Sequence, residues 1–327
     1  MKTRLLTLLA AALLAPLVSA LHAAPEAKVT KFDDRVRVEL GGQLFTEYFV
    51  KGALRPYCYP VLAADGMQLN RDFPMKKDTA GEENDHPHHR SLWFTHGSVG
   101  GFDFWDDKKN TKIVNDAVTA SAKGGVATIQ SANSWIGPDG AVVCTDKTTI
   151  TLQGVPEGRI IDWEVTVKAQ PDKPLVFGDT KEGSMAIRLA QWLTAPHKIK
   201  DGITAPTGTI INDSGTKNSE TWGKKSKWVD YYGVKDGKTY GVAMFDNPKN
   251  PRFPTWWHVR DYGLFAANPF GQHDFESTKE KKLPANTGDL TVPAGGSVTF
   301  RWRFYFHMGD EKAGKVAEAF AAYAAGT

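Results

Sequence analysis

The chain has 327 residues, 41% of them hydrophobic and 24% charged, and its formal net charge is +3. This composition is typical of a globular protein and excludes a disordered chain, a collagen-like chain and a polytopic membrane protein. The balance of 40 basic against 37 acidic residues also argues against a dedicated nucleic-acid binder, which would carry clustered basic residues.

Residues 1–24 have the layout of a secretory signal peptide. Two basic residues precede an apolar run over residues 5–17, and small residues follow that run. The apolar run is too short to span a bilayer comfortably, and the rest of the sequence contains no second such run. We therefore expect cleavage after Ala20 or Ala24, a periplasmic or secreted protein, and no membrane attachment after cleavage.

Most of the remaining sequence predicts β structure. Residues 35–40 alternate charged and apolar side chains with a period of two, and Gly41-Gly42 connects them to a hairpin partner at residues 44–49. Further strands are predicted at residues 126–131, 142–151, 159–167, 186–193, 229–234, 241–245 and 298–306. Strands do not alternate with long helical patterns, so a parallel sheet is not expected.

One helix is predicted, at the C-terminus. Asp310 is a suitable N-cap, and Val316, Phe320 and Tyr323 recur at spacings of four and three. No repeat of fixed period and no long linker divides residues 25–327, so we expect one domain. The predicted fold is all-β: a large antiparallel β-sandwich, of which a galactose-mutarotase-like supersandwich is one form, with a short C-terminal helix.

The sequence contains two cysteines, Cys58 and Cys144. In an oxidising compartment they could form one disulfide, and they could equally be two buried thiols. A catalytic cysteine is the less expected alternative, because a reactive thiol is readily oxidised there.

A histidine-rich segment is the strongest functional signal. Four of the nine histidines fall within residues 86–96. In an extended backbone His86 and His88 would project to one face, and His89 would face the other side unless the chain bends. Neutral imidazoles transfer protons near neutral pH, so the cluster predicts a functional site. The alternative is a set of ordinary histidines hydrogen-bonded to the backbone.

A divalent metal ion is the one cofactor that this cluster suggests. The His-x-His-His spacing is not an established zinc pattern, so a further ligand must come from elsewhere. We consider the set His86, His88 and His273. The sequence has no Gly-rich phosphate loop and no Gly-x-Ser-x-Gly segment, which leaves a nucleotide cofactor and a serine nucleophile unsupported.

Two other segments supply candidate site residues. Lys181 and Glu182 are adjacent and precede a predicted strand. They are either an acid/base pair of the site or two charged residues of a solvated turn. Residues 254–273 combine tryptophans with His258, and such a combination suits a groove that stacks sugar rings, although core packing also explains tryptophans. The predicted substrate-binding residues are Arg90, Trp93, Arg188, Trp257, Arg260 and Asn268.

Several segments resemble a PmoA-like bacterial family of unknown function, which carries the label methane oxygenase by transfer of a name. The matching segments are residues 55–60, 85–94, 101–105, 179–183, 222–223 with Trp228, 241–243 with 247–248, and 257–260. This resemblance implies an exported β-sandwich protein that accompanies sugar-handling genes. The membrane subunit of that name is polytopic, and this chain has no spanning segment after residue 24, so we do not expect a methane oxygenase.

We therefore predict a carbohydrate-active enzyme, a glycoside lyase or hydrolase, whose substrates include 3-keto sugars. A carbonyl at C3 acidifies the C2 proton, and loss of that proton expels the C1 substituent. An imidazole or Glu182 would be the base. The enolate would be stabilised by Lys181, by Arg90 or by a metal, and His258 would protonate the leaving oxygen. The predicted catalytic residues are His86, His89, Lys181, Glu182 and His258. A mutarotase- or epimerase-like enzyme and a non-catalytic glycan-binding module are the alternatives; in each case the partner is a carbohydrate or small glycoside.

Overall fold

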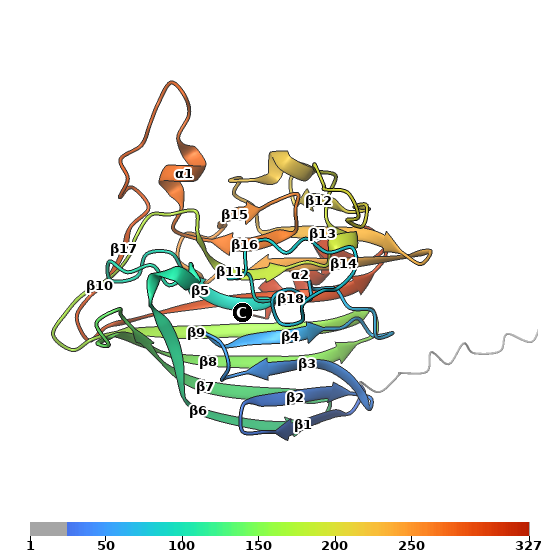
Figure 1. The fold of residues 1–327 in the computed structure, drawn as a ribbon, viewed down its shortest axis with the longest axis horizontal. Helices are drawn as coiled ribbons and strands as arrows, with labels where there is room; N and C mark the ends of the chain where they lie inside the picture. The colour runs from blue at the N-terminus through green and yellow to red at the C-terminus, as the bar shows by residue number, and fades with distance from the viewer. Residues whose placement is uncertain (1–24, 327) are drawn as a thin grey trace, which may run out of the picture.

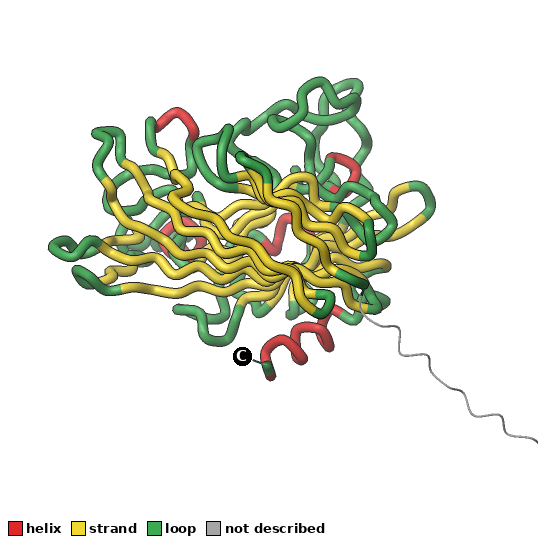
Figure 2. The backbone as a smooth tube through the Cα atoms, turned by 90° about the horizontal axis from the view of Figure 1, so that it is seen from below, coloured by secondary structure: helices red, strands yellow, loops and turns green. Residues whose placement is uncertain are grey.

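The structure is a computed structural model that describes residues 25–326, and Figure 1 shows the arrangement of its elements. The predicted signal peptide, residues 1–24, lies outside the described residues. Two large antiparallel sheets face each other, and Figure 2 shows the C-terminal helix outside the strand layers.

The first sheet combines five strands from the N-terminal part of the described chain with three from its later parts. In spatial order it holds β1 (Ala27–Lys31), β2 (Arg35–Leu40), β3 (Gln43–Phe49), β4 (Tyr57–Val61), β5 (Leu92–His96), β11 (Gly183–Arg188), β16 (Leu264–Asn268) and β15 (Trp256–Val259). The last four strands are consecutive in the sheet but come from three distant parts of the sequence. They bring the predicted site segments together.

The second sheet contains the longest strands. Its spatial order is β12 (Thr209–Asn212), β13 (Trp228–Lys235), β14 (Lys238–Asp246), β18 (Ser297–Met308), β9 (Gly158–Ala169), β8 (Val142–Val155), β7 (Val126–Ile136) and β6 (Lys112–Lys123). A separate small sheet pairs β10 (Leu175–Phe177) with β17 (Leu290–Val292), and the two α-helices are α1 (Gln272–Glu276) and α2 (Val316–Ala325).

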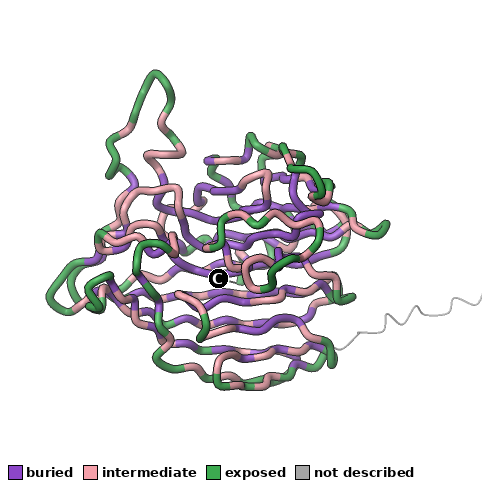
Figure 3. Tube along the Cα trace, viewed as in Figure 1, coloured by how far each residue is buried: buried purple, intermediate pink, exposed green. Residues whose placement is uncertain are grey.

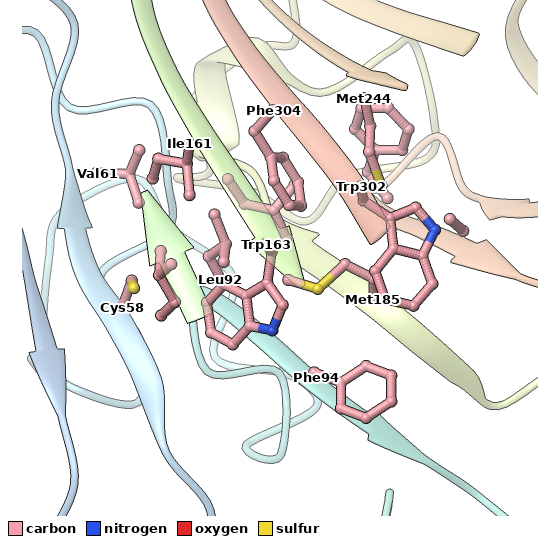
Figure 4. Close-up of a cluster of buried hydrophobic side chains, with 14 of the residues drawn as sticks. Cys58, Val61, Leu92, Phe94, Ile161, Trp163, Met185, Met244, Trp302 and Phe304 are labelled. Atoms are coloured by element: carbon pink, nitrogen blue, oxygen red, sulfur yellow. The ribbon is translucent and has the colours of Figure 1, made fainter. Parts of the chain in front are cut away.

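The main apolar core lies between the two large sheets, where Figure 3 shows buried strand positions. Phe94 on β5 lies 5.7 Å from Trp302 on β18, measured between ring centroids. Figure 4 shows Met185 of the first sheet beside Trp163 and Trp302 of the second. Burial of these large side chains is the main favourable term for joining the sheets. The prediction of an antiparallel β-sandwich is confirmed.

The C-terminal helix exists, but it begins later than the capping pattern predicts. The carboxylate of Asp310 accepts hydrogen bonds from the backbone N–H groups of Lys312 and Ala313, which form a turn. Lys315 then adopts a left-handed conformation, and α2 starts at Val316. The N-cap prediction is therefore wrong, because Asp310 stabilises the turn before the helix.

Most predicted strands are confirmed, and one is too long. The strand predicted over residues 186–193 ends at Arg188, and Gln191–Leu193 forms a short 3-10 helix. Cys58 and Cys144 are both buried free thiols, so the disulfide alternative is not realised. Within residues 25–326, no helix has the length and apolar character needed to cross a membrane.

Candidate active site

The floor of the candidate site is one row of residues across four strands of the first sheet. The register pairs Trp93 with Ala186, Ala186 with Ala266, and Ala266 with His258. Their strand neighbours, such as Leu92 and Ile187, point into the sandwich core, so this row lies on the outer face. The two alanines in the middle are fully buried, and of the four residues in this row only His258 lines the cavity above it.

A cavity of about 390 Å³ lies above this floor. Its walls are loops that precede β5 and β11, follow β5, and connect β15 to β16. The lining includes four histidines: His86, His88, His89 and His258. It also includes the predicted residues Lys181, Glu182 and Arg260. The volume lies within the range of pockets that bind small molecules.

The three histidines of the 86–89 segment converge because the chain turns there. His86 has a positive φ of 43°, and the N–H of His89 donates to the carbonyl of His86 over 3.0 Å. The His86 and His89 rings stack with centroids 4.8 Å apart, and the His88 ring meets His89 edge-on at 4.5 Å. Of the two alternatives for His89, the bent chain is the one found, so its ring lies with those of His86 and His88.

Asp85 orients the His86 ring. Its Oδ2 accepts a hydrogen bond from Nδ1 of His86 over 2.7 Å, and its Oδ1 accepts from the guanidinium groups of Arg71 and Arg188, the latter over 2.8 Å. Both arginine side chains are only 1% exposed. Burial by itself would raise the pKa of Asp85, but the His86 hydrogen bond and the two guanidinium charges lower it overall. With Nδ1–H bound to a carboxylate, the neutral His86 ring keeps its lone pair on Nε2.

His89 has the opposite tautomer. A guanidinium nitrogen of Arg188 donates to its Nδ1 over 3.0 Å, so the ring proton of neutral His89 is on Nε2. Burial, reinforced by the charge of Arg188, holds the pKa of His89 well below its usual value. His89 is therefore suited to donate a hydrogen bond, and the predicted role of base does not fit, because its lone pair is already occupied.

His258 is a neutral acceptor. Its Nδ1–H donates to the carbonyl oxygen of Lys181 over 2.7 Å, which leaves the Nε2 lone pair free. Burial, with the nearby charge of Arg260, lowers the pKa of His258 to about 3. A ring in this state is neutral at neutral pH and carries no proton on Nε2, so the expected role as proton donor to a leaving group does not fit. Burial also lowers the pKa of His88, to about 4.

Lys181 and Glu182 form an ion pair at the cavity wall. Nζ of Lys181 lies 3.0 Å from Oε1 of Glu182, and their side chains are 40% and 36% exposed. The loop that carries them is anchored by Asn268, whose side-chain amide donates to the carbonyl of Thr180 over 2.9 Å. Asn268 is fully buried and is absent from the cavity lining, so it positions this loop.

Four lining residues, Asp103, Trp105, Asp106 and Tyr262, are not among the predicted site residues. The two carboxylates follow β5, where Oδ1 of Asp103 accepts from the backbone N–H groups of Trp105 and Asp106. A signal existed, since residues 101–105 belong to the segments that carry the family resemblance. The Tyr262 ring is parallel to His86 at 5.3 Å, and burial raises the pKa of its hydroxyl.

Other predicted substrate-binding residues lie elsewhere. Trp257 is fully buried on the core side of β15, and its indole N–H donates to the carbonyl of Ser226 over 3.0 Å. Its neighbour His258 faces the cavity, so alternation along the strand excludes Trp257 from it. Trp93 is buried beneath His89, with ring centroids 5.5 Å apart. Arg90 is outside the cavity lining and lies 3.6 Å from Asp107.

The predicted metal-ligand set does not come together. His86 and His88 line the cavity, whereas His273 lies on α1, outside the lining, with its Nδ1 bonded to the carbonyl of Leu283. In the part of the chain that the structure describes, no group of three or more His, Cys, Asp or Glu side chains is arranged to hold a metal ion. The residues present therefore do not fit the metal alternative.

Another cavity, of about 470 Å³, lies on the second sheet, but both of its arginines are paired with its carboxylates. The Arg303 guanidinium donates two hydrogen bonds to Asp162, over 2.6 and 2.8 Å, and Arg301 donates to Glu164 over 2.7 Å. No histidine lines that cavity. The histidine-lined cavity therefore has the chemistry that a catalytic site needs.

The sequence matches a family model, and the fold is similar to solved structures of low sequence identity. The model of a family of unknown function, DUF6807, matches residues 35–321, and no curated protein matches the sequence. An alpha-galactosidase structure from Lactobacillus brevis is similar at a TM-score of 0.42 and 9% identity, over 88% of this chain and 40% of that chain. A galactose mutarotase-like protein from Lactobacillus casei ATCC 334 gives a TM-score of 0.41 and 9% identity, over 86% of this chain and 100% of that chain.

Proposed function

Since the chain belongs to DUF6807, a family whose function is unknown, we propose a function from its own site: a carbohydrate-active lyase or hydrolase that acts on 3-keto glycosides. The observation that carries this proposal is the Asp85–His86 pair. A carboxylate on Nδ1 fixes the tautomer of an imidazole whose other nitrogen is left as a base. The His86 side chain is 41% exposed, so the base is accessible to a ligand.

The proposed reaction begins with proton abstraction. Nε2 of His86 takes the proton from C2 of the sugar, and the electrons of the C2–H bond form an enolate with the C3 carbonyl. Nε2–H of His89 is the donor available to the enolate oxygen, and its other nitrogen is bonded to the Arg188 cation. The enolate then re-forms the C3 carbonyl and a C1–C2 double bond, and the C1–O bond breaks.

The leaving oxygen must take up a proton as the C1–O bond breaks. The Lys181 ammonium, held by Glu182, is the donor that we assign to this step, in place of His258. The products are an unsaturated 3-keto sugar and an alcohol. Addition of water to the double bond gives the products of net hydrolysis, so a lyase and a hydrolase share the same first step.

The cavity wall supports a sugar as the ligand. Asp103 and Asp106 offer carboxylate oxygens to hydroxyl groups, and Trp105 and Tyr262 offer aromatic surface to the C–H face of a pyranose ring. The resemblance to PmoA-like proteins, with their sugar-handling neighbours, is consistent with this ligand class. We further propose that the protein acts after export, because of the leader-like residues 1–24.

The test uses a p-nitrophenyl 3-ketoglucoside and the release of p-nitrophenolate. We expect turnover by the wild-type protein and a loss of about 100-fold or more in kcat/KM for His86→Gln, because a general base is removed. His273→Gln is the matched control, since its ring lies outside the cavity, and its kcat/KM should stay within about twofold of wild type.

Two results would contradict the proposal. Full activity of His86→Gln would show that another group is the base. Absence of turnover of every 3-keto glycoside by the wild type, with or without an added divalent metal, would exclude the lyase and hydrolase activities altogether.

One observation favours a second candidate, a mutarotase- or epimerase-like enzyme. The free Nε2 lone pair of His258 gives the cavity a second imidazole nitrogen besides that of His86. Proton exchange on both sides of a sugar carbon needs two such groups. Optical rotation of plain aldoses would change in the presence of an epimerase or mutarotase, whereas the 3-keto lyase would leave it unchanged. If sugars bind without any reaction, the glycan-binding module is the correct alternative.

A further inference from the structure

One cation in the cavity has no anionic partner. Each of the other arginines in residues 25–326 has its side chain within ion-pair or hydrogen-bond distance of a carboxylate or a carbonyl oxygen, as Arg90 has Asp107 at 3.6 Å. For Arg260, no such contact exists in this part of the chain. The carboxylate nearest in sequence, Asp261, feels the charge of Arg260 but does not form an ion pair with it.

Aromatic rings hold the Arg260 guanidinium instead. Its central carbon lies 5.7 Å from the ring centroid of Trp222 and 5.9 Å from that of Tyr262. Rings attract the face of a guanidinium group, and the N–H donors point outward in its plane. Apart from the Tyr262 hydroxyl, residues 25–326 place no acceptor at those donors. A carboxylate or a phosphate can match this free edge with two parallel hydrogen bonds.

The charges of the cavity are unevenly distributed. Arg260 follows β15 at one side of the floor, whereas Asp103 and Asp106 follow β5 at the other side. The other lining cation, Lys181, is already neutralised by Glu182 at 3.0 Å. An unpaired charge in a partly buried wall is costly, and a ligand anion would offset that cost.

We propose that the cavity binds a sugar that carries an oxyanion, either a carboxylate or a phosphate, with that group on Arg260 and the sugar hydroxyls toward Asp103 and Asp106. This inference rests on the proposed function and names the substrate class of the same site. It makes Arg260 the residue that selects acidic sugars over neutral ones.

Titration calorimetry with three ligands tests the proposal: methyl glucuronoside, glucose 6-phosphate and methyl glucoside. We expect an acidic sugar to bind at least about tenfold more tightly than the neutral glucoside. Arg260→Gln should remove that preference and leave binding of the neutral glucoside within about twofold, and Arg260→Lys should restore part of it. Arg303→Gln, on the second sheet, is the matched control and should keep the preference.

The outcomes separate the two proposals. A preference for the glucuronoside over the phosphate identifies the anion as a carboxylate, and the reverse order identifies it as a phosphate. Equal binding of the neutral and acidic sugars, or an acidic preference that survives in Arg260→Gln, overturns the role of Arg260 while turnover of 3-keto glycosides still supports the lyase. Failure of every sugar to bind, together with absent turnover, overturns the proposed function itself.

Discussion

Hydrogen-bond partners assign different roles to neighbouring histidines in this cavity. His86 donates to a carboxylate, His89 accepts from a guanidinium group, and His258 donates to a backbone carbonyl. The three rings have the same intrinsic chemistry, yet one is available as a base, one as a donor and one as a second acceptor. The partner of the second nitrogen decides which role each ring has.

The low pKa of His258 predicts a dependence of stability on pH. In the unfolded chain this ring binds a proton below its ordinary pKa of about 6.5, whereas in the folded protein it stays neutral down to about pH 3. The unfolded state therefore binds more protons between these values, and acidification costs folding free energy. From pH 6.5 to pH 4 the loss is about 3 kcal/mol from this ring alone.

Chemical denaturation of wild type and His258→Gln at several pH values measures this effect. The glutamine amide retains a donor for the carbonyl of Lys181 but does not titrate. We expect the stability of the wild type to fall more steeply on acidification than that of the variant. Parallel curves for the two proteins would contradict the assigned protonation state.

A buried ion pair links two strands of the second sheet, β18 and β13, just before the C-terminal helix. Nε2 of His307, near the end of β18, lies 3.1 Å from Oδ1 of Asp230 on β13, and both side chains are fully buried. Burial alone would lower the pKa of His307, but the charge of Asp230 raises it overall. The chain then passes through residues 309–315 to α2, where Phe320 packs against Phe245 at 5.7 Å.

Asp230→Asn should destabilise the protein by about 3 to 5 kcal/mol, because it removes one partner of a buried pair. A histidine with a raised pKa stabilises the fold below its ordinary pKa, and that contribution is lost as the pH rises through its folded value. The penalty should therefore be largest near pH 5.5 and smaller at pH 8.5. Asp236→Asn, in an exposed turn, is the control and should unfold like wild type. A penalty that is the same at both pH values would contradict a charged His307.

Strand prediction succeeded or failed according to how many faces of a strand are buried. β2 alternates partly exposed and buried residues, so its period-two pattern is visible in the sequence. β5, β15 and β16 are buried at every position, because the core covers one face and the site covers the other. Their sequences have no alternation, so the prediction missed the strands that form most of the floor of the site.

The accessibility of the two cysteine thiols to a reagent measures whether the core of the sandwich is closed. Cys58 and Cys144 are completely buried, and burial raises the pKa of both thiols. We expect a thiol reagent to label neither cysteine in the folded protein and both after denaturation without reductant. Detection of no thiols in the denatured chain would show that the two cysteines form a disulfide. Slow labelling of the native protein would instead measure opening of the core.

The sequence alone determined the fold class, the C-terminal helix and the segments that supply the site. Alternation and apolar spacing are local properties, and the 86–96 histidines are conspicuous without any structure. Only the tertiary structure decided which nitrogen of each ring is free and that Trp257 faces the core. Those features depend on contacts between distant parts of the chain, such as Arg188 with Asp85 and His89, and on the face of the sheet that each strand residue occupies. No local pattern encodes them. The hydrogen-bond partner of one ring nitrogen fixes which nitrogen carries the proton and which keeps the lone pair, and only the fold brings that partner into place.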